Sequence, residues 1–146
     1  MKKVSVIVAC RNEEKFIGRC LGSLLSQDYP EELIEIIVVD GLSTDNTLEI
    51  ANRFKKKHPN LTLEMNAKGY KYPGLNQALK RATGDYIAIA DAHSLYPKSY
   101  IRELAETLDQ GKADNVGGGR IFHPRTKGLL AKAITFALTE PFGFCT

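Results

Sequence analysis

Short apolar runs alternate with helix-like segments along most of this chain. Three runs, at residues 4–9, 33–39 and 86–90, are rich in apolar and β-branched side chains, and residues 61–65 form a weaker fourth. Continuous apolar runs of this length indicate strands buried on both faces of a sheet. Strands that alternate with helices pair in parallel, with helices on both faces. The sequence therefore predicts an α/β fold with a mostly parallel sheet.

The segments between the apolar runs have the spacing and the end signals of helices. Asn12 is predicted to cap the first helix, with Glu13 and Glu14 in its first turn. A later helix is predicted to start at Pro73 and to end at Gly84 as its C′ residue. Further helices are predicted after Ser43, after Pro97 and over residues 127–138.

Size and composition fit one domain, which we predict over residues 1–146. The chain is 43% hydrophobic and 25% charged, which is ordinary for a soluble globular protein. Its net charge of +3 is small, and no stretch interleaves aromatic with basic residues. We therefore predict no nucleic-acid partner.

The cysteines and the two chain ends bear on location and completeness. Cys10, Cys20 and Cys145 lack metal-type spacing, and the first strand starts too early for a signal peptide, so we predict a cytoplasmic protein. The apolar end, residues 141–146, follows no element pattern and suggests a truncated domain. An incomplete sheet would expose an edge, which makes a homo-oligomer a reasonable expectation.

Polar side chains follow three of the predicted strands. Arg11 follows the first, Asp40 the second, and Asp91 and His93 the last. In open parallel sheets, ligands bind outside the carboxyl ends of the strands, at the topological switch point. A cation, metal-binding acids and free helix-start amides suit a nucleotide diphosphate. The sequence therefore predicts a nucleotide-type ligand.

Asp91 and His93 are the predicted metal ligands. Side chains at i and i+2 of an extended backbone lie on the same side, so both could reach one divalent cation. A carboxylate is a hard ligand and an imidazole broadens the choice, so Mn²⁺ or Mg²⁺ is expected. The alternative is that Asp91 forms a turn or caps a helix.

Other candidate residues also have structural interpretations. Arg11 could pair with Glu14 at the surface, and Asp40 could cap the turn at Gly41. Lys71 could contact a phosphate or could be a solvated loop lysine. The conjunction of the three strand ends favours the ligand interpretation.

Three blocks, at residues 4–14, 38–47 and 84–93, resemble family 2 glycosyltransferases of the GT-A fold in order and spacing. The resemblance runs from residue 3 to about residue 120, and the Asp-Gly-Leu-Ser and Asp-Ala-His-Ser forms look closest to enzymes that build exopolysaccharides such as succinoglycan. It implies a Rossmann-like GT-A nucleotide-diphospho-sugar transferase fold, of which this chain is the donor-binding part.

The resemblance also implies roles for individual residues. The donor is expected to be a nucleotide-diphosphate sugar, commonly a UDP-sugar. Gly41 replaces a second Asp that in the family often recognises uracil, so the nucleobase of the donor is left open. His93 replaces the last Asp of an Asp-x-Asp metal motif. The matched positions are Ala9, Arg11 and Glu13 in the first nucleotide loop, Asp40 in the second block, and Asp91 and His93 in the metal motif.

By the same resemblance the reaction is a metal-dependent, inverting transfer to a polysaccharide or lipid-linked acceptor. The family's catalytic base lies downstream, so the base is not found in this chain. A full-length form associated with the inner face of the cell membrane is an open alternative for location. The alternative function is a truncated nucleotide-binding fragment or an assembly module without turnover.

Overall fold

The structure, a computed structural model, describes residues 1–119 and 128–139. It divides into two compact units, Met1–Asp114 and Asn115–Thr146. The second unit contains α5 (Leu129–Thr139), which confirms the helix predicted near the C-terminus. Residues 141–146, which suggested truncation, lie outside the described residues. Among the described residues, no helix combines the length and apolarity needed to cross a membrane.

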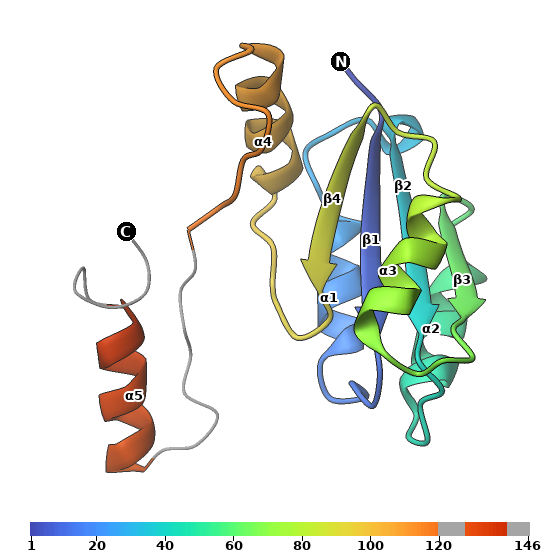
Figure 1. Ribbon diagram of the computed structural model, residues 1–146, viewed down its shortest axis with the longest axis vertical. Helices are drawn as coiled ribbons and strands as arrows, with labels where there is room; N and C mark the ends of the chain where they lie inside the picture. Colours follow the sequence, from blue (N-terminus) through green and yellow to red (C-terminus); the bar gives the residue numbers. More distant parts are fainter. Residues whose placement is uncertain (120–127, 140–146) are drawn as a thin grey trace. The chain divides into compact units, whose positions relative to one another are not determined.

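The first unit is built on a four-stranded parallel sheet, as predicted (Figure 1). Its order is β3-β2-β1-β4, so the chain moves outward from β1 in one direction and then returns to add β4 on the other side. The point where the order reverses, between β1 and β4, is the topological switch point. The strands are β1 (Val4–Cys10), β2 (Ile34–Asp40), β3 (Leu61–Met65) and β4 (Tyr86–Asp91).

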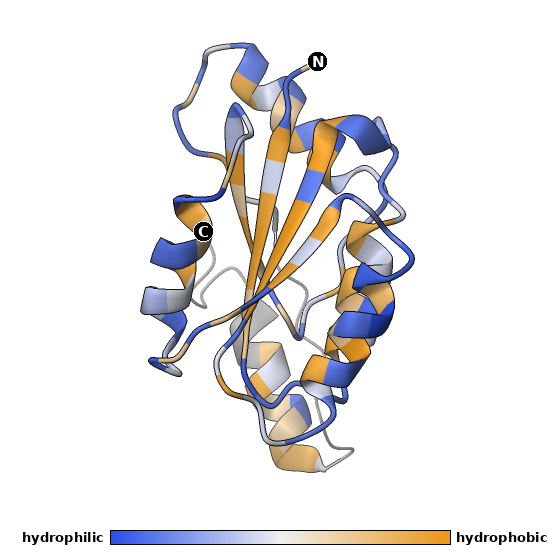
Figure 2. Ribbon diagram, turned by 90° about the vertical axis from the view of Figure 1, so that its right-hand side faces the viewer, coloured by the Kyte–Doolittle hydropathy of each residue, from blue (hydrophilic) through white to orange (hydrophobic). Residues whose placement is uncertain are grey.

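Helices cover both faces of this sheet. In Figure 1, α1 (Ile17–Leu24) and α2 (Thr47–Lys55) lie behind the sheet, and α3 (Lys71–Leu79) lies in front. Successive strand residues point to opposite faces. The larger core therefore takes Val6 and Val8 of β1, and the smaller core takes Ile7 between them. Figure 2 shows the strands as mainly hydrophobic, in agreement with their burial on both faces.

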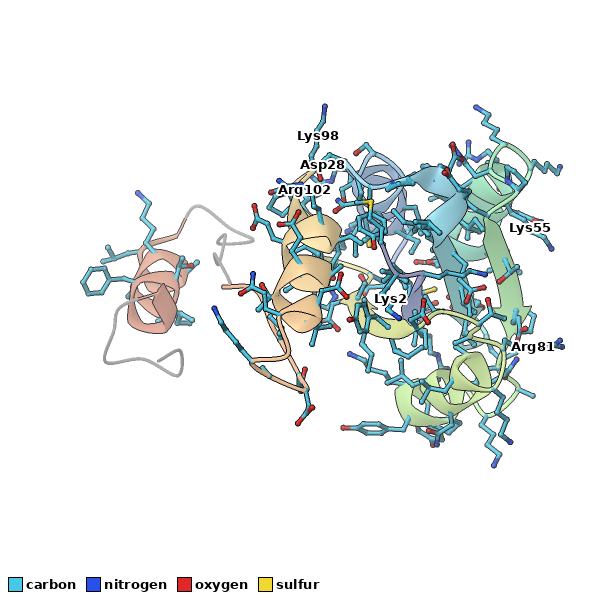
Figure 3. The ribbon with its side chains drawn as sticks, turned by 90° about the horizontal axis from the view of Figure 1, so that it is seen from above. Lys2, Asp28, Lys55, Arg81, Lys98 and Arg102 are labelled. Carbon is cyan, nitrogen blue, oxygen red and sulfur yellow. The ribbon has the colours of Figure 1, made fainter. Side chains whose placement is uncertain are left out.

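Polar contacts fasten α4 (Tyr100–Asp109) to the segment that precedes the short 3₁₀ helix η1 (Glu31–Leu33). Arg102 Nε donates to Asp28 Oδ2 at 3.2 Å, and Figure 3 shows these two side chains together. Gln27 accepts a hydrogen bond from the backbone of Ile101 and donates one to the carbonyl of Pro97. These bonds anchor the far end of the β4–α4 connection, which follows Asp91 and contains the predicted metal ligand His93.

The helix cap predicted at Asn12 is wrong. α1 begins only at Ile17, and Asn12 has a left-handed backbone with φ of 55°. Its Oδ1 accepts a hydrogen bond from Thr44 N at 2.8 Å, so the side chain joins the loops that follow β1 and β2. The short polar side chain of Asn tolerates this conformation, which explains its presence in a tight inter-loop contact.

The role predicted for Gly84 is also wrong. α3 begins at Lys71, two residues before Pro73, and already ends at Leu79. A Cβ atom at Gly84 would lie 2.5 Å from Ser5 N and 2.6 Å from Ser5 Oγ. The Gly84 N–H donates to that hydroxyl at 2.7 Å. Glycine is therefore required by close backbone approach at the start of β4, and not by a helix end.

Candidate functional site

A crevice lies at the carboxyl ends of the strands, where the sequence predicted a ligand site. Its volume is about 170 Å³. This is smaller than the roughly 300–1,000 Å³ of many small-molecule pockets, so a nucleotide sugar would extend beyond it. Six of the seven predicted site residues line it. The lining residues are Ala9, Cys10, Arg11, Glu13, Val39, Gly41, Asn66, Gly69, Tyr70, Lys71, Asp91, Ala92 and His93.

Hydrogen bonds hold three loops together on one side of the crevice. Gly41 N donates to Cys10 O at 2.8 Å, and Arg11 Nη1 donates to Gly69 O at 3.3 Å. A Cβ atom at Gly41 would lie 3.0 Å from Gly69 O. The loop after β3 therefore occupies the space that a larger residue at position 41 would need, which is a physical reason for glycine there.

Asp40 lies behind the crevice and not on its surface. The residue is fully buried, and both of its carboxylate oxygens are engaged by Ser43, one by the backbone N–H at 2.8 Å and one by the hydroxyl. These bonds close the turn after β2, as the structural interpretation of Asp40 predicted. A nucleotide contact by this carboxylate stays a prediction.

Asn66 is a crevice residue that the sequence reasoning missed. It is buried, its N–H donates to Asp40 O at 2.8 Å, and its Nδ2 donates to Tyr70 O at 2.7 Å. It thereby shapes the turn that carries Gly69 and Tyr70 into the crevice. The available signal was its position directly after β3, because the strand-end argument applies to this strand as well.

Glu13 and His93 meet across the crevice from the loops after β1 and β4. His93 Nδ1 lies 3.1 Å from Glu13 Oε1. Ser94 N donates to Asp91 O at 3.0 Å, so residues 91–94 form a turn. The extended backbone assumed for Asp91 and His93 is therefore wrong, although the turn still brings both side chains to the crevice.

Lys71 and Asp91 form an ion pair across the crevice. Lys71 Nζ lies 2.6 Å from Asp91 Oδ1, and the two side chains are 51% and 29% exposed. Lys71 is the first residue of α3 and Asp91 the last residue of β4, so the pair joins opposite sides of the site. Lys71 is thus a half-exposed helix residue paired with Asp91, where the structural interpretation was a solvated loop lysine.

Tyr96 positions the backbone of Asp91. Its hydroxyl oxygen accepts a hydrogen bond from Asp91 N at 2.7 Å and donates to Asp91 O at 3.4 Å. Burial raises the pKa of Tyr96 to about 12, so the hydroxyl stays protonated at neutral pH and keeps both contacts. The end of β4 is therefore fixed by β1 through the sheet and by the Tyr96 hydroxyl at Asp91.

Replacing Tyr96 with Phe is expected to destabilise the protein by about 1–2 kcal/mol, because the Asp91 N–H loses its partner. Urea unfolding measures this change. The matched control is Tyr100→Phe, because the Tyr100 ring packs 5.0 Å from that of Tyr96 while its hydroxyl makes no hydrogen bond within the described residues. Equal stability of the two variants would contradict a positioning role for the Tyr96 hydroxyl.

The buried cysteines do not contribute thiolates to this site. Burial, helped by Asp40 for Cys10 and by Asp91 for Cys20, raises the pKa of both thiols to about 12. Both are therefore protonated at neutral pH, and a thiolate is the form that binds metals or attacks electrophiles. This agrees with the sequence-based prediction that they pack as small hydrophobic residues.

The chemistry of the remaining donors fits a hard or borderline divalent cation. No group of three or more His, Cys, Asp or Glu side chains converges as a metal site in the part of the chain that the structure describes. Asp91 and His93 would therefore supply a carboxylate and an imidazole, with further ligands from a bound phosphate and water. This donor set suits Mn²⁺, and Mg²⁺ when bound largely through phosphates.

A strand-end crevice with cations, acids and a helix start lies where open parallel α/β sheets bind their ligands. Residues 5–145 match the glycosyl transferase family 2 model, and the chain belongs to this family. A relative in Methanococcus voltae is 32% identical over 97% of this chain and 46% of its own length. It is a dolichyl N-acetyl-α-D-glucosaminyl phosphate 3-β-D-2,3-diacetamido-2,3-dideoxy-β-D-glucuronosyltransferase.

Solved structures agree with this assignment. The mannosyltransferase PcManGT from Pyrobaculum calidifontis, in complex with GDP-Man and Mn²⁺, has a TM-score of 0.69 and 37% identity, covering 73% of this chain and 32% of its own. S. aureus TarS in complex with UDP-GlcNAc has a TM-score of 0.68 and 32% identity, covering 86% and 38%. The predicted Rossmann-like GT-A fold is confirmed. The chain spans less than half the length of these proteins.

Proposed function

We propose that this chain binds the nucleotide-diphosphate part of a sugar donor in the strand-end crevice. In this proposal it is the donor-binding part of a glycosyltransferase that transfers the sugar to a polysaccharide or lipid-linked acceptor. The observation that carries the proposal is the meeting of Arg11, Lys71 and Asp91 at one crevice. Their cations and carboxylate come from three separate elements at the topological switch point, where α/β sheets bind ligands.

Each side chain has a proposed task in holding the donor. Arg11 and Lys71 present cations to the diphosphate, and Ala9 and Glu13 border the nucleotide as part of the loop after β1. Asp91 and His93 hold the divalent cation. When bound, this cation neutralises the charge that develops on the departing diphosphate. Asp40 is proposed to act on the nucleotide through the loop that its hydrogen bonds to Ser43 support.

The transfer itself is proposed to invert the anomeric carbon. This requires a carboxylate base that deprotonates the acceptor hydroxyl on the face opposite the leaving group. Glu13 is the carboxylate besides Asp91 that lines the described crevice, and it is paired with His93. We therefore assign no catalytic base in this chain and expect it in a part of the protein that follows.

For the nucleobase of the donor, the two candidates are uracil and guanine. TarS binds UDP-GlcNAc and PcManGT binds GDP-Man, so related folds accept either nucleotide. The position where uracil-binding relatives are expected to have an Asp is Gly41, where a Cβ atom would lie in tight contact with Gly69 O at 3.0 Å. We retain UDP as the first candidate from the resemblance of the three motifs and GDP as the second.

Calorimetric titration of the chain with UDP and GDP, in Mn²⁺ and in EDTA, tests the donor site. We expect one nucleotide to bind in Mn²⁺ and to bind much more weakly in EDTA. CDP and inorganic phosphate serve as controls for the base and the phosphate. Absence of both heat and thermal stabilisation with every nucleotide would contradict the proposal.

The second candidate is a nucleotide-binding piece without turnover. It is favoured by the lack of an assigned base among the described crevice residues. Incubation with UDP-sugars, followed by measurement of released UDP, separates the candidates. Release above a no-protein control favours transferase or hydrolase chemistry in this chain, and binding without release favours the piece without turnover.

We also propose that the exposed side of β4 is covered in the working protein. Ile87 and Ile89 on this strand are 43% and 56% exposed, on the sheet face that also carries Ile7. Such exposure is consistent with self-association or with a further part of the same protein. We also propose that the protein is located in the cytoplasm, either at the inner face of the cell membrane or away from it.

A further inference from the structure

We propose that Lys71 is an internal counter-ion of Asp91, which competes with the divalent cation for this carboxylate and is released to the diphosphate when the donor binds. The inference rests on the proposed function. It adds that cation and nucleotide bind cooperatively because one lysine side chain changes partners. Lys71 then determines how strongly the site holds a cation before the donor arrives.

Lys71 occupies a position at which it would compete with a cation bound to Asp91. Lys71 Nζ lies 2.6 Å from Asp91 Oδ1, an oxygen atom that a bound cation would also need. Two cations compete for one carboxylate when they approach the same oxygens. Both residues line the crevice, so the Lys71 ammonium can also reach a phosphate that is bound there.

The backbone of Asp91 is held in place, whereas the side chain of Lys71 can move. The Asp91 backbone is held by β1 through the sheet and by Tyr96 through two contacts. Lys71 has a flexible four-carbon stem, and half of its side chain is exposed. The ammonium can therefore leave the carboxylate without a change in the backbone.

The position of Lys71 at the start of α3 favours a new anionic partner once its ammonium leaves Asp91. Lys71 is the first residue of α3, and no acidic residue lies in the first turn of this helix. A cation at a helix N-terminus is opposed by the helix dipole, so a nearby anion stabilises Lys71 there. Asp91 is that anion in the present structure, and the diphosphate would replace it once a metal ion engages Asp91.

These steps predict positive coupling between cation and nucleotide. Mn²⁺ alone must break the ion pair and leave the ammonium without a partner. Mn²⁺ with UDP breaks the same pair but gives the ammonium a phosphate. By thermodynamic reciprocity, UDP therefore tightens Mn²⁺ binding by the same factor as Mn²⁺ tightens UDP binding.

Mn²⁺ binding measured by electron paramagnetic resonance, without and with saturating UDP, tests this account in the wild type and in Lys71→Met. The variant keeps the aliphatic stem and removes the charge. We expect it to bind Mn²⁺ alone about two- to fivefold more tightly, the scale of a partly exposed ion pair. The gain in Mn²⁺ affinity on adding UDP should shrink relative to the wild type.

The matched control is Lys68→Met, which removes an equal charge from an exposed lysine in the loop just before α3, with no side-chain partner in the described part of the chain. It should resemble the wild type in both measurements. Unchanged or weaker Mn²⁺ affinity in Lys71→Met, or an undiminished gain from UDP, overturns the inference. Wild-type protein that binds Mn²⁺ but no nucleotide contradicts the proposed function instead, and the Mn²⁺ comparison still tests Lys71.

Discussion

Asp91→Ala is expected to weaken Mn²⁺-dependent nucleotide binding by at least about 100-fold while the fold is retained. Loss of groups that merely orient metal ligands costs about 10–100-fold in metal affinity, so loss of a direct ligand should cost at least as much. The fold should survive because Asp91 ends β4 and its carboxylate lies in the crevice rather than in the core. Calorimetry with UDP or GDP in Mn²⁺ measures the binding, and circular dichroism checks the fold.

The matched control is Asp85→Asn, just before the opposite end of the same strand. Asp85 is exposed and accepts a hydrogen bond from Lys3 N at 2.9 Å, which an Asn oxygen can also accept. This variant should bind nucleotide as the wild type does. If Asp91→Ala retained wild-type affinity, or if the wild type bound equally well in EDTA, Asp91 would not be a metal ligand.

Gly84→Ala is expected to destabilise the protein by roughly 3 kcal/mol, the upper part of the range for an overpacked buried position. The added Cβ would meet Ser5 N at 2.5 Å, and backbone atoms in the central strand cannot move aside as a flexible side chain can. The substitution would also disturb the Gly84–Ser5 hydrogen bond, whose hydroxyl in turn donates to Glu35. Urea unfolding measures the change.

Gly22→Ala provides the comparison for this experiment. Gly22 lies inside α1, and a Cβ atom there would meet nothing within 4 Å. Ala is favoured over Gly in a helix by roughly 0.5–1 kcal/mol, so this variant should be neutral or more stable. Equal effects of the two substitutions would show that close approach to Ser5 is not what requires glycine at position 84.

The sheet and the place of the site were predictable because they depend on local patterns. Residues 4–9 and 33–39 form buried strands on account of their own apolar composition, and alternation with helices is enough to make them parallel. Parallel strands end on the same edge, so Arg11 and Asp91 had to lie near one another. No long-range information was needed for this step.

The contacts inside the site were not predictable in this way. Lys71 and Asp91 are 20 residues apart, and Glu13 and His93 are 80 apart. Their pairing depends on how the loops bend, as at Asn12 with its positive φ. A polar residue after a strand can turn into the crevice or hold its own loop, and composition does not distinguish the two outcomes.

Glycines illustrate the same difficulty. Gly84 has the sequence context of a helix end, and its actual requirement comes from Ser5 on a strand far away in sequence. At position 41 an Asp was expected only because of the family resemblance. The physical reason for glycine there is the nearby carbonyl of Gly69, which lies on another loop. In both cases the decisive neighbour is brought close by the tertiary fold.

Amide chemical-shift mapping with UDP and Mg²⁺ tests the convergence of the loops most directly, because each loop reports separately in one spectrum. If UDP proves not to be the nucleotide bound, the calorimetrically selected nucleotide replaces it. The account predicts that shifts cluster at residues 9–13, 41–43, 66–71 and 91–93. A folded spectrum without changes at saturating nucleotide, or changes confined to residues away from these four loops, would contradict it.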